Sequence, residues 1–300
     1  MVISKSRVAM NKLTNKKRAQ VVKCLVEGMS IRVTTRITGV AKNTVIKLLT
    51  DLGDACWEYQ DKTFRDLSCK RIQVDEIWSF VYAKQRNVPE EFRGTFGYGD
   101  VWTWTAIDAD TKLIPSWFVG SRNADAAWAF MHDLAGRLSN RVQLTSDGHG
   151  AYLDAVDWAF ESNIDYAQLI KRYGQSPEGT RRYSPPRFVR ADARAVMGKP
   201  KAEHISTSFV ERQNLTMRMH MRRFTRLTNA FSKKVENLSA AVSLHFMFYN
   251  FAKVHQTLRV TPAMEAGLTD HIWTVEEILA IMPERKPGKR GPYKKRNNSN

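Results

Sequence analysis

The stretch KRIQVDEIWSFVYAK, residues 70–84, places two adjacent acids inside a run of apolar side chains. Most of the apolar residues are β-branched or aromatic, and such residues favour a β-strand. Side chains alternate along a strand, so Asp75 and Glu76 point to opposite faces of it. A carboxylate in so apolar a run needs a cation or hydrogen-bond donors to offset its desolvation. The stretch therefore predicts a strand whose acids find partners elsewhere in the fold.

Further strands and helices are expected after this strand. DVWTWTAIDADTKLIPSWFVG, residues 100–120, is typical of a hairpin, and its turn acids have a simple explanation because Asp is a common turn residue. A helix is expected over 125–138. RVQLTSDGHGAY, residues 141–152, then predicts a short strand that ends at Asp147, and helices follow around 154–160 and around Glu211.

Three acids far apart in the sequence would meet if the two strands are neighbours and the later helix crosses their ends. The acids are Asp75, Asp147 and Glu211. The order of elements matches a ribonuclease H-like mixed sheet. Phosphodiester chemistry uses two divalent ions roughly 3.5–4 Å apart, which activate the attacking oxygen and stabilise the leaving oxygen. Carboxylate oxygens are the hard ligands that Mg²⁺ prefers.

The segment STSFVERQNLTMRMHMRRFTR, residues 206–226, holds one acid among five arginines. Counting three, seven and eleven positions on from Glu211 gives Asn214, Arg218 and Arg222, which would share one face of a helix. Glu211 has two interpretations. It is either a member of a surface salt bridge, as most exposed Glu–Arg pairs are, or a metal ligand beside a track of phosphate-binding arginines.

The N-terminal region predicts a helix-turn-helix. Ser30 can cap a second helix, Gly39 can adopt a positive φ in the turn, and a third helix follows. In such a unit the second helix of the pair lies in the major groove of DNA. The exposed side of that helix would present these DNA-binding candidates: Lys42, Asn43, Thr44 and Lys47. A three-helix packing module without DNA contacts is the alternative.

The net charge of +17 in 300 residues is concentrated in three blocks. Residues 1–23 have seven basic and no acidic side chains, 171–234 have sixteen against four, and 284–300 have seven against one, so the rest of the chain is net acidic. Such blocks are typical of polyanion contacts, with solvated faces and a disordered tail as the alternative.

The sequence also favours a soluble protein without disulfides. No stretch approaches the roughly 20 apolar residues that cross a bilayer, and the first residues lack the apolar segment of a signal peptide, so we expect a cytoplasmic protein and no membrane partner. The three cysteines are too scattered for a disulfide framework or a zinc site, and we expect them to be reduced. They are Cys24, Cys56 and Cys69.

The chain resembles the transposases of the insertion-sequence-one type, which carry a DDE catalytic triad. The matching segments are TGVAKNTVIKLL, VDEIWSFVYAK, TSDGHGAY and, most specifically, FVERQNLTMRMHMRRFTRLTNAFSKKVENL, and the resemblance runs from about residue 14 to about 255. It implies that Asp75, Asp147 and Glu211 are the catalytic, metal-binding acids. Arg212, Asn214 and Arg218 belong to the motif around Glu211, and with Arg222 they are expected to contact DNA. Relatives often begin with a cysteine-based zinc motif, which this sequence lacks.

The fold class expected from these features is α/β. An all-α helix-turn-helix domain over 1–62 precedes a ribonuclease H-like catalytic domain over 70–255 that has a basic insertion at about 164–204. After these two domains we expect a helical extension over 256–283 and a disordered basic tail over 284–300.

The resemblance implies an enzyme that acts on double-stranded DNA. It would cut at the ends of an insertion sequence and join the 3′ hydroxyl to target DNA, with Mg²⁺ as cofactor, Mn²⁺ as a substitute and no zinc. We expect a nucleoid-associated prokaryotic protein that forms a homo-oligomer on DNA. The alternatives are a DNA-binding regulator without catalysis and a ribonuclease H-like junction nuclease. His255 has two open roles, a hydrogen-bonding residue at a helix end or a catalytic residue.

Overall fold

The computed structural model describes residues 13–174, 187–225 and 229–283. The expected basic tail over 284–300 lies outside the described residues, as does most of the first basic block. Within the described residues, no helix is both long and apolar enough to cross a membrane.

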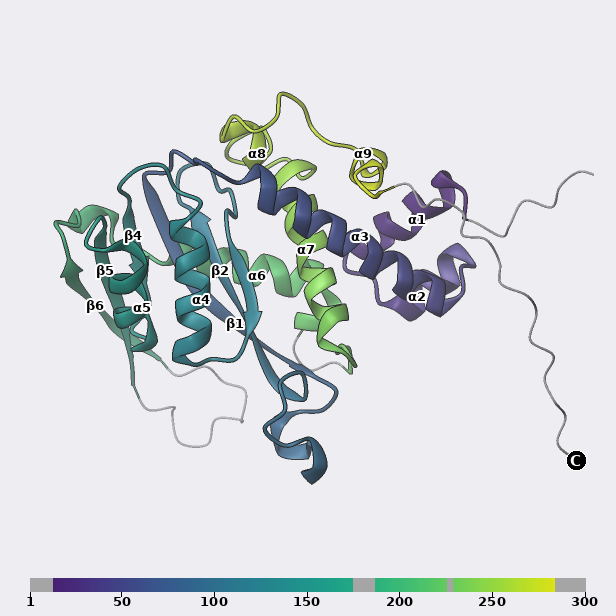
Figure 1. Ribbon diagram of the computed structural model, residues 1–300, viewed down its shortest axis with the longest axis horizontal. Helices are drawn as coiled ribbons and strands as arrows, with labels where there is room; N and C mark the ends of the chain where they lie inside the picture. The colour runs from purple at the N-terminus through teal and green to yellow at the C-terminus, as the bar shows by residue number, and fades with distance from the viewer. Residues whose placement is uncertain (1–12, 175–186, 226–228, 284–300) are drawn as a thin grey trace, which may run out of the picture.

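A six-stranded sheet in the order β3-β2-β1-β4-β5-β6 lies in the left part of the view in Figure 1, and the N-terminal helices lie at the right. Its strands are β1 Arg71–Val81, β2 Gly99–Asp108, β3 Trp117–Gly120, β4 Gln143–Ser146, β5 Asp165–Tyr173 and β6 Phe188–Met197. β4 is parallel to β1 and β5, whereas β2 runs antiparallel to β1 and β3, and β6 runs antiparallel to β5. This mixed order, with helices on both faces, confirms the α/β, ribonuclease H-like fold class.

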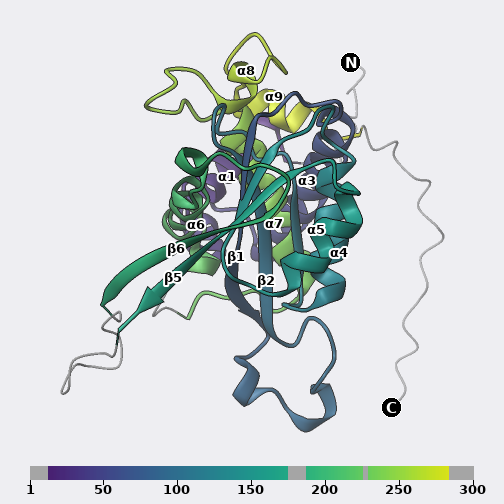
Figure 2. The same cartoon turned by 90° about the vertical axis from the view of Figure 1, so that its left-hand side faces the viewer.

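Helices cover the two faces of the sheet unequally. α4 Ala124–Ala135 and α5 Ala151–Phe160 pack side by side on one face, and α6 Ser208–His220 lies on the other (Figure 2). α7 Val235–Phe251, α8 Pro262–Glu265 and α9 Val275–Ala280 follow α6 in the chain. Short 3-10 turns occur at Gln85–Asn87, Glu90–Phe92, Ala202–His204 and Arg222–Phe224.

The three N-terminal helices lie where the sequence predicts them. They are α1 Asn15–Val26, α2 Ile31–Thr38 and α3 Lys42–Thr63. The Ser30 hydroxyl accepts a hydrogen bond from the Val33 N–H and so caps α2, which satisfies a donor that the helix leaves free. Gly39 ends α2 with φ of +69°, a left-handed conformation that glycine adopts without steric cost.

The long third helix joins these N-terminal helices to the rest of the protein. α3 packs along α7, and Gly53 lies so close to α7 that an added Cβ would be 2.5 Å from Ala240 Cα. The hydrophobic core is one continuous cluster that runs from Val21 and Leu52 to Val74 and Phe246. The domain boundary expected at residue 62 is therefore not a break in packing.

The segment expected to be a basic insertion contributes two strands to the sheet. Its beginning forms β5, which pairs in parallel with β4, and its later part forms the edge strand β6. The start of β5 is buried, whereas most of β6 is exposed. The exposed, basic composition of these strands concealed them, since strands without a buried face lack the alternation that identifies a strand.

Candidate active site

The first two candidate acids lie on neighbouring parallel strands. Gln73 in β1 is aligned with Thr145 in β4, and two residues further along each chain are Asp75 and Asp147. Asp147 directly follows the last residue of β4, and its Oδ1 accepts a hydrogen bond from the His149 N–H at 2.9 Å. The two half-buried carboxyl groups therefore meet at one position across the sheet.

A buried side chain places α6 against this position. Gln73 Oε1 accepts hydrogen bonds from the backbone N–H groups of Phe209 at 2.8 Å and Val210 at 3.2 Å, in the first turn of α6. Gln73 and Asp75 are two residues apart in β1 and so point to the same face. Because Glu211 is the next residue of α6, this contact brings the third candidate acid to the face that carries Asp75.

The electrostatics of Asp75 reflect this convergence. Burial raises the pKa of Asp75 to about 7, and the carboxylates of Glu76, Asp147 and Glu211 each push it in the same direction. Two donors oppose them: the Glu76 backbone N–H donates to Asp75 Oδ1 at 2.9 Å, and the Asn214 side-chain amide donates to Oδ2 at 2.8 Å. The negative charge of the carboxylates around Asp75 exceeds what these two hydrogen bonds compensate. A bound cation would stabilise the ionised form of such a group of carboxylates.

Glu211 has a cationic partner that the sequence did not indicate. Its Oε1 forms an ion pair with Lys171 Nζ of β5 and accepts a hydrogen bond from the Thr207 hydroxyl. The side chain of Glu211 is 44% exposed, so the ion pair is partly solvated. The salt-bridge interpretation of Glu211 thus has a structural basis, but the partner is a lysine on the sheet and not an arginine of its own helix.

The donor set suits Mg²⁺ in chemistry, although its present arrangement is not that of a bound ion. Asp75, Asp147 and Glu211 offer hard carboxylate oxygens in a partly desolvated, acidic environment. Among the described residues, however, no group of three His, Cys, Asp or Glu side chains is placed to hold one metal ion. In this arrangement Lys171 and Thr207 both contact Oε1 of Glu211.

The neighbouring acid, Glu76, is a structural residue on the opposite face of β1. Its buried carboxylate accepts hydrogen bonds from Arg122 Nε at 2.6 Å and the Tyr152 hydroxyl at 2.9 Å. The Arg122 guanidinium lies 4.8 Å from the Trp102 ring centroid. Glu76 therefore has the cation and the donor that a carboxylate in this apolar strand needs.

The turn acids after β2 are also structural. Asp110 forms an ion pair with Arg71, while the Asp108 carboxylate accepts hydrogen bonds from the backbone N–H groups of Asp110 and Thr111.

His255 Nδ1 lies 3.0 Å from the Thr257 hydroxyl, a contact that matches the hydrogen-bonding role. The three cysteines are free and buried.

The DNA-binding candidates of α3 lie together at the start of that helix. Lys42, Asn43, Thr44 and Lys47 are all exposed, and Lys47 also forms an ion pair with Asp51 at 3.1 Å. Their exposure leaves them accessible to a ligand, which is what recognition of DNA would require.

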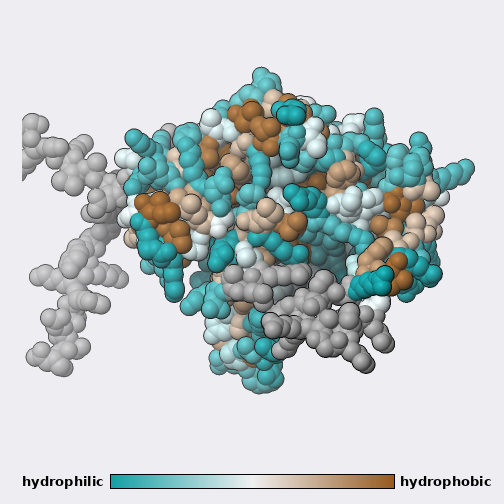
Figure 3. All heavy atoms as spheres, turned by 180° about the vertical axis from the view of Figure 1, so that it is seen from behind, coloured by the Kyte–Doolittle hydropathy of each residue, from teal (hydrophilic) through white to brown (hydrophobic). Residues whose placement is uncertain are grey.

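The candidates around α6 are more dispersed than expected. α6 ends at His220, so Arg222 begins a separate 3-10 turn and does not share a helical face with Glu211 and Arg218. Asn214 is buried and bonded to Asp75, whereas Arg212 is exposed. The apolar side chains of this segment belong to the core: Val210, Met217, Met221 and Phe224. The side of the molecule opposite to α4 and α5 is mostly hydrophilic with separate apolar patches (Figure 3).

Comparisons with known proteins give distant structural similarity only. No protein-family model and no curated protein matches the chain. A piggyBac transposase synaptic complex with hairpin DNA has 9% sequence identity and a TM-score of 0.45, over 93% of this chain and 73% of that one. The Mos1 strand transfer complex has 9% identity and a TM-score of 0.24, over 94% of this chain and 83% of that one. Similarities this low do not assign an activity to the protein.

Proposed function

We propose that the protein is a DNA transposase that cuts at the ends of an insertion sequence and joins the freed 3′ hydroxyl to target DNA. The observation that supports the proposal is the electrostatic coupling of Asp75 to acids of two other elements, Asp147 and Glu211. Asp75 comes from the middle of β1, Asp147 from the end of β4 and Glu211 from the first turn of α6. Glu76, the neighbouring acid of β1, points to the opposite face and pairs with Arg122, so it is outside this group.

In this proposal Asp75, Asp147 and Glu211 would hold Mg²⁺, for which Mn²⁺ would substitute. When bound, the ions would activate an attacking oxygen and stabilise the leaving oxygen of the phosphodiester. Gln73 and Asn214 position the acids, because one fixes the start of α6 on β1 and the other orients the Asp75 carboxylate. Lys171 neutralises Glu211 in this structure and would compete with a bound ion for its carboxylate.

DNA contacts would be divided between two regions. The exposed residues at the start of α3 would contact base edges in the element's ends, since base contacts specify a sequence. Arg212, Arg218 and Arg222 would contact phosphates near the site. Cutting two ends and joining both to one target requires more than one active site, so we expect a homo-oligomer on DNA.

The ion pair between Lys171 and Glu211 supports a competing function, a DNA-binding regulator without catalysis. In that function Glu211 serves only to pair with Lys171, and a partly exposed pair contributes at most about 1 kcal/mol. The two functions predict different effects on DNA cleavage when the charge of Glu211 is removed.

Cleavage and binding assays with Glu211→Gln separate the two functions. End cleavage with Mg²⁺ and DNA affinity without metal are measured for the parental protein, for Glu211→Gln and for Glu203→Gln, which removes an exposed acid outside the site. A transposase loses cleavage only in Glu211→Gln and keeps DNA affinity in both variants. Cleavage that continues near the parental rate in Glu211→Gln contradicts the proposed mechanism, and a parental protein that binds DNA but never cuts it is a regulator. Inverted repeats flanking the coding region would independently favour the transposase.

A further inference from the structure

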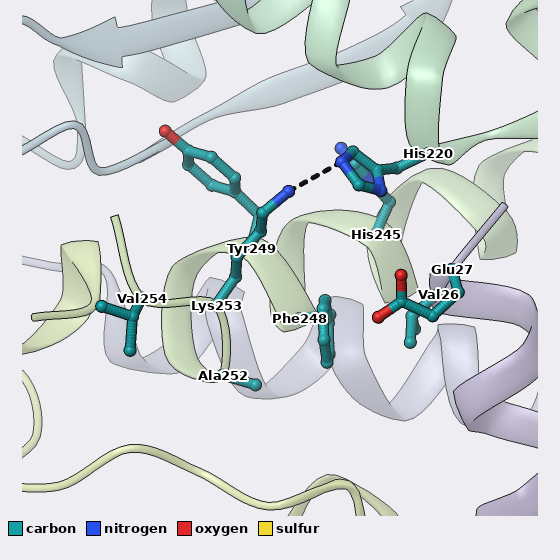
Figure 4. Close-up of a pocket in the computed structure, with 9 residues that line it drawn as sticks. All are labelled: Val26, Glu27, His220, His245, Phe248, Tyr249, Ala252, Lys253 and Val254. Atoms are coloured by element: carbon teal, nitrogen blue, oxygen red, sulfur yellow. Dashed lines mark hydrogen bonds between the residues drawn. The ribbon is translucent and has the colours of Figure 1, made fainter. Parts of the chain in front are cut away.

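A cavity of about 270 Å³ lies between the end of α1, the end of α6 and α7 (Figure 4). Its polar lining comes from four side chains: Glu27, His220, His245 and Lys253. Val26, Phe248 and Ala252 provide apolar wall between them. None of these residues belongs to the acidic site of β1, β4 and α6, so the cavity needs an explanation of its own.

His245 is the most informative residue of the lining. It is 6% exposed, and its Nε2 has no hydrogen-bond partner. Burial lowers the pKa of His245 to about 3, and the nearby His220 and Lys253 act in the same direction, so the imidazole is neutral. A buried polar atom without a partner is unfavourable, and a bound group with a complementary atom would satisfy it.

Charged groups of opposite sign line the same cavity without touching. Lys253 Nζ donates to His220 Nε2 at 2.8 Å (Figure 4). Burial lowers the pKa of Lys253, and the Glu27 carboxylate is near enough to act against that effect. Within the described chain Glu27 nevertheless forms no ion pair with Lys253 or any other cation. The lining thus offers a donor, from Lys253, and an acceptor, from Glu27, that do not pair with each other in the described chain.

We propose that this cavity binds a guanine base. Guanine is flat and largely apolar on its faces, as the Phe248 and Val26 wall requires, and it carries acceptors and donors on different edges. Its O6 and N7 atoms are acceptors, and they would face Lys253 Nζ and His245 Nε2. Its N1–H and exocyclic amine are donors, and they would face the Glu27 carboxylate.

Other ligands of similar chemistry fit this lining less well. Adenine presents an amine where guanine has O6, so its amine would meet the Lys253 ammonium, and it has no N–H on the edge that would face Glu27. A bare phosphate would satisfy Lys253 and His245 but would place its charge near Glu27. A metal ion would meet the repulsion of the Lys253 ammonium, which lies 2.8 Å from His220 Nε2 in the same lining.

Binding of the neutral nucleosides tests the base preference without the phosphate, which a chain of net charge +17 would attract anywhere. Deoxyguanosine should bind the parental protein with one site and at least about tenfold more tightly than deoxyadenosine, the effect of one good hydrogen bond to a charged group. Glu27→Gln and Lys253→Met should each remove that preference. The matched controls Glu265→Gln and Lys62→Met change exposed residues outside the cavity and should keep it.

A second arm identifies the source of the base. Duplex DNA with one unpaired guanine is compared with the same duplex carrying an unpaired adenine, for the parental protein and for Glu27→Gln. A guanine preference that Glu27→Gln abolishes makes an extrahelical base of DNA the ligand, and a preference seen only with deoxyguanosine makes it a free nucleoside or nucleotide. Equal or undetectable binding of the two nucleosides, or a guanine preference that persists in Glu27→Gln and Lys253→Met, overturns the proposal. These readouts require no strand cleavage, so they stand whether or not the protein is a transposase.

Discussion

Asn214 donates its side-chain amide to the Asp75 carboxylate at 2.8 Å, although 139 positions separate the two residues in the sequence. Asn214 is buried, so its side chain is directed to the sheet and not to solvent. This contact reassigns a residue that the motif around Glu211 suggested as a DNA contact. We therefore propose that Asn214 orients Asp75 of the candidate site.

Asn214→Ala should therefore impair cleavage while DNA affinity stays nearly constant. Loss of the amide leaves Asp75 free to move, and misplacement of a catalytic group costs roughly 10–100-fold in rate. The measurement is single-turnover end cleavage together with DNA affinity without metal. Arg212→Ala, which changes an exposed neighbour, should instead weaken DNA binding. An Asn214→Ala protein that loses as much DNA affinity as Arg212→Ala would restore the direct DNA contact.

The strands and helices that bury one face could be predicted from the sequence, whereas contacts between distant elements could not. β1 shows its apolar composition directly, and the caps at Ser30 and Gly39 mark the ends of helices by local chemistry. The pairing of Lys171 with Glu211 joins an exposed strand to a helix 40 positions later. No local sequence pattern predicts a contact between residues so far apart in the chain. The basic composition around Lys171 instead suggested an insertion.

Acid should destabilise the protein through His245. Its pKa is about 3 in the folded protein against an ordinary value of 6.5, so between these values the unfolded chain binds a proton that the folded chain does not. The contribution of neutral His245 to the free energy of unfolding is nearly complete above pH 6.5. It falls as the pH falls, by about 2–3 kcal/mol between pH 7 and about pH 4.5. Denaturant unfolding at the two pH values measures it, and His245→Gln should show a smaller loss of stability than the parental protein.

Other histidines titrate in the same range but do not obscure this result. Burial also lowers the pKa of His220 and of His255, and both remain in the variant. The difference between the parental protein and His245→Gln therefore isolates one imidazole. Identical pH dependence of the two proteins would show that His245 is not held neutral by its surroundings.

Gly53→Ala should destabilise the protein by about 1–3 kcal/mol, because overpacking forces the two helices apart. The added Cβ would collide with the Ala240 backbone of α7. Gly136→Ala is a matched control: Gly136 has φ of −67°, and its nearest neighbour to an added Cβ is at 3.5 Å. The control should be neutral or slightly stabilising. Thermal unfolding compares the two, and equal midpoints would mean that α3 and α7 are not in close contact.

Exchange of the residues at the start of α3 should change which DNA is bound. Asn43→Ala and Thr44→Ala should reduce the preference for the element's ends over unrelated DNA, since base contacts specify the sequence. Lys42→Ala should weaken binding to all DNA and lower its salt dependence by about one counterion. Affinity for both kinds of DNA is measured over a series of salt concentrations. An unchanged preference in all three variants would favour the simple packing role of these helices.

The close packing of α3 against α7 limits how such a protein can acquire new targets. Replacing residues 1–62 with an unrelated module would remove α3, which packs along α7 and contributes the core residues Leu49, Leu52 and Cys56. Hybrid proteins made by joining whole modules at that boundary would therefore fail at folding before they could be tested for specificity. Retargeting has to proceed by substitution of a few exposed side chains on a retained scaffold, both in evolution and in the laboratory.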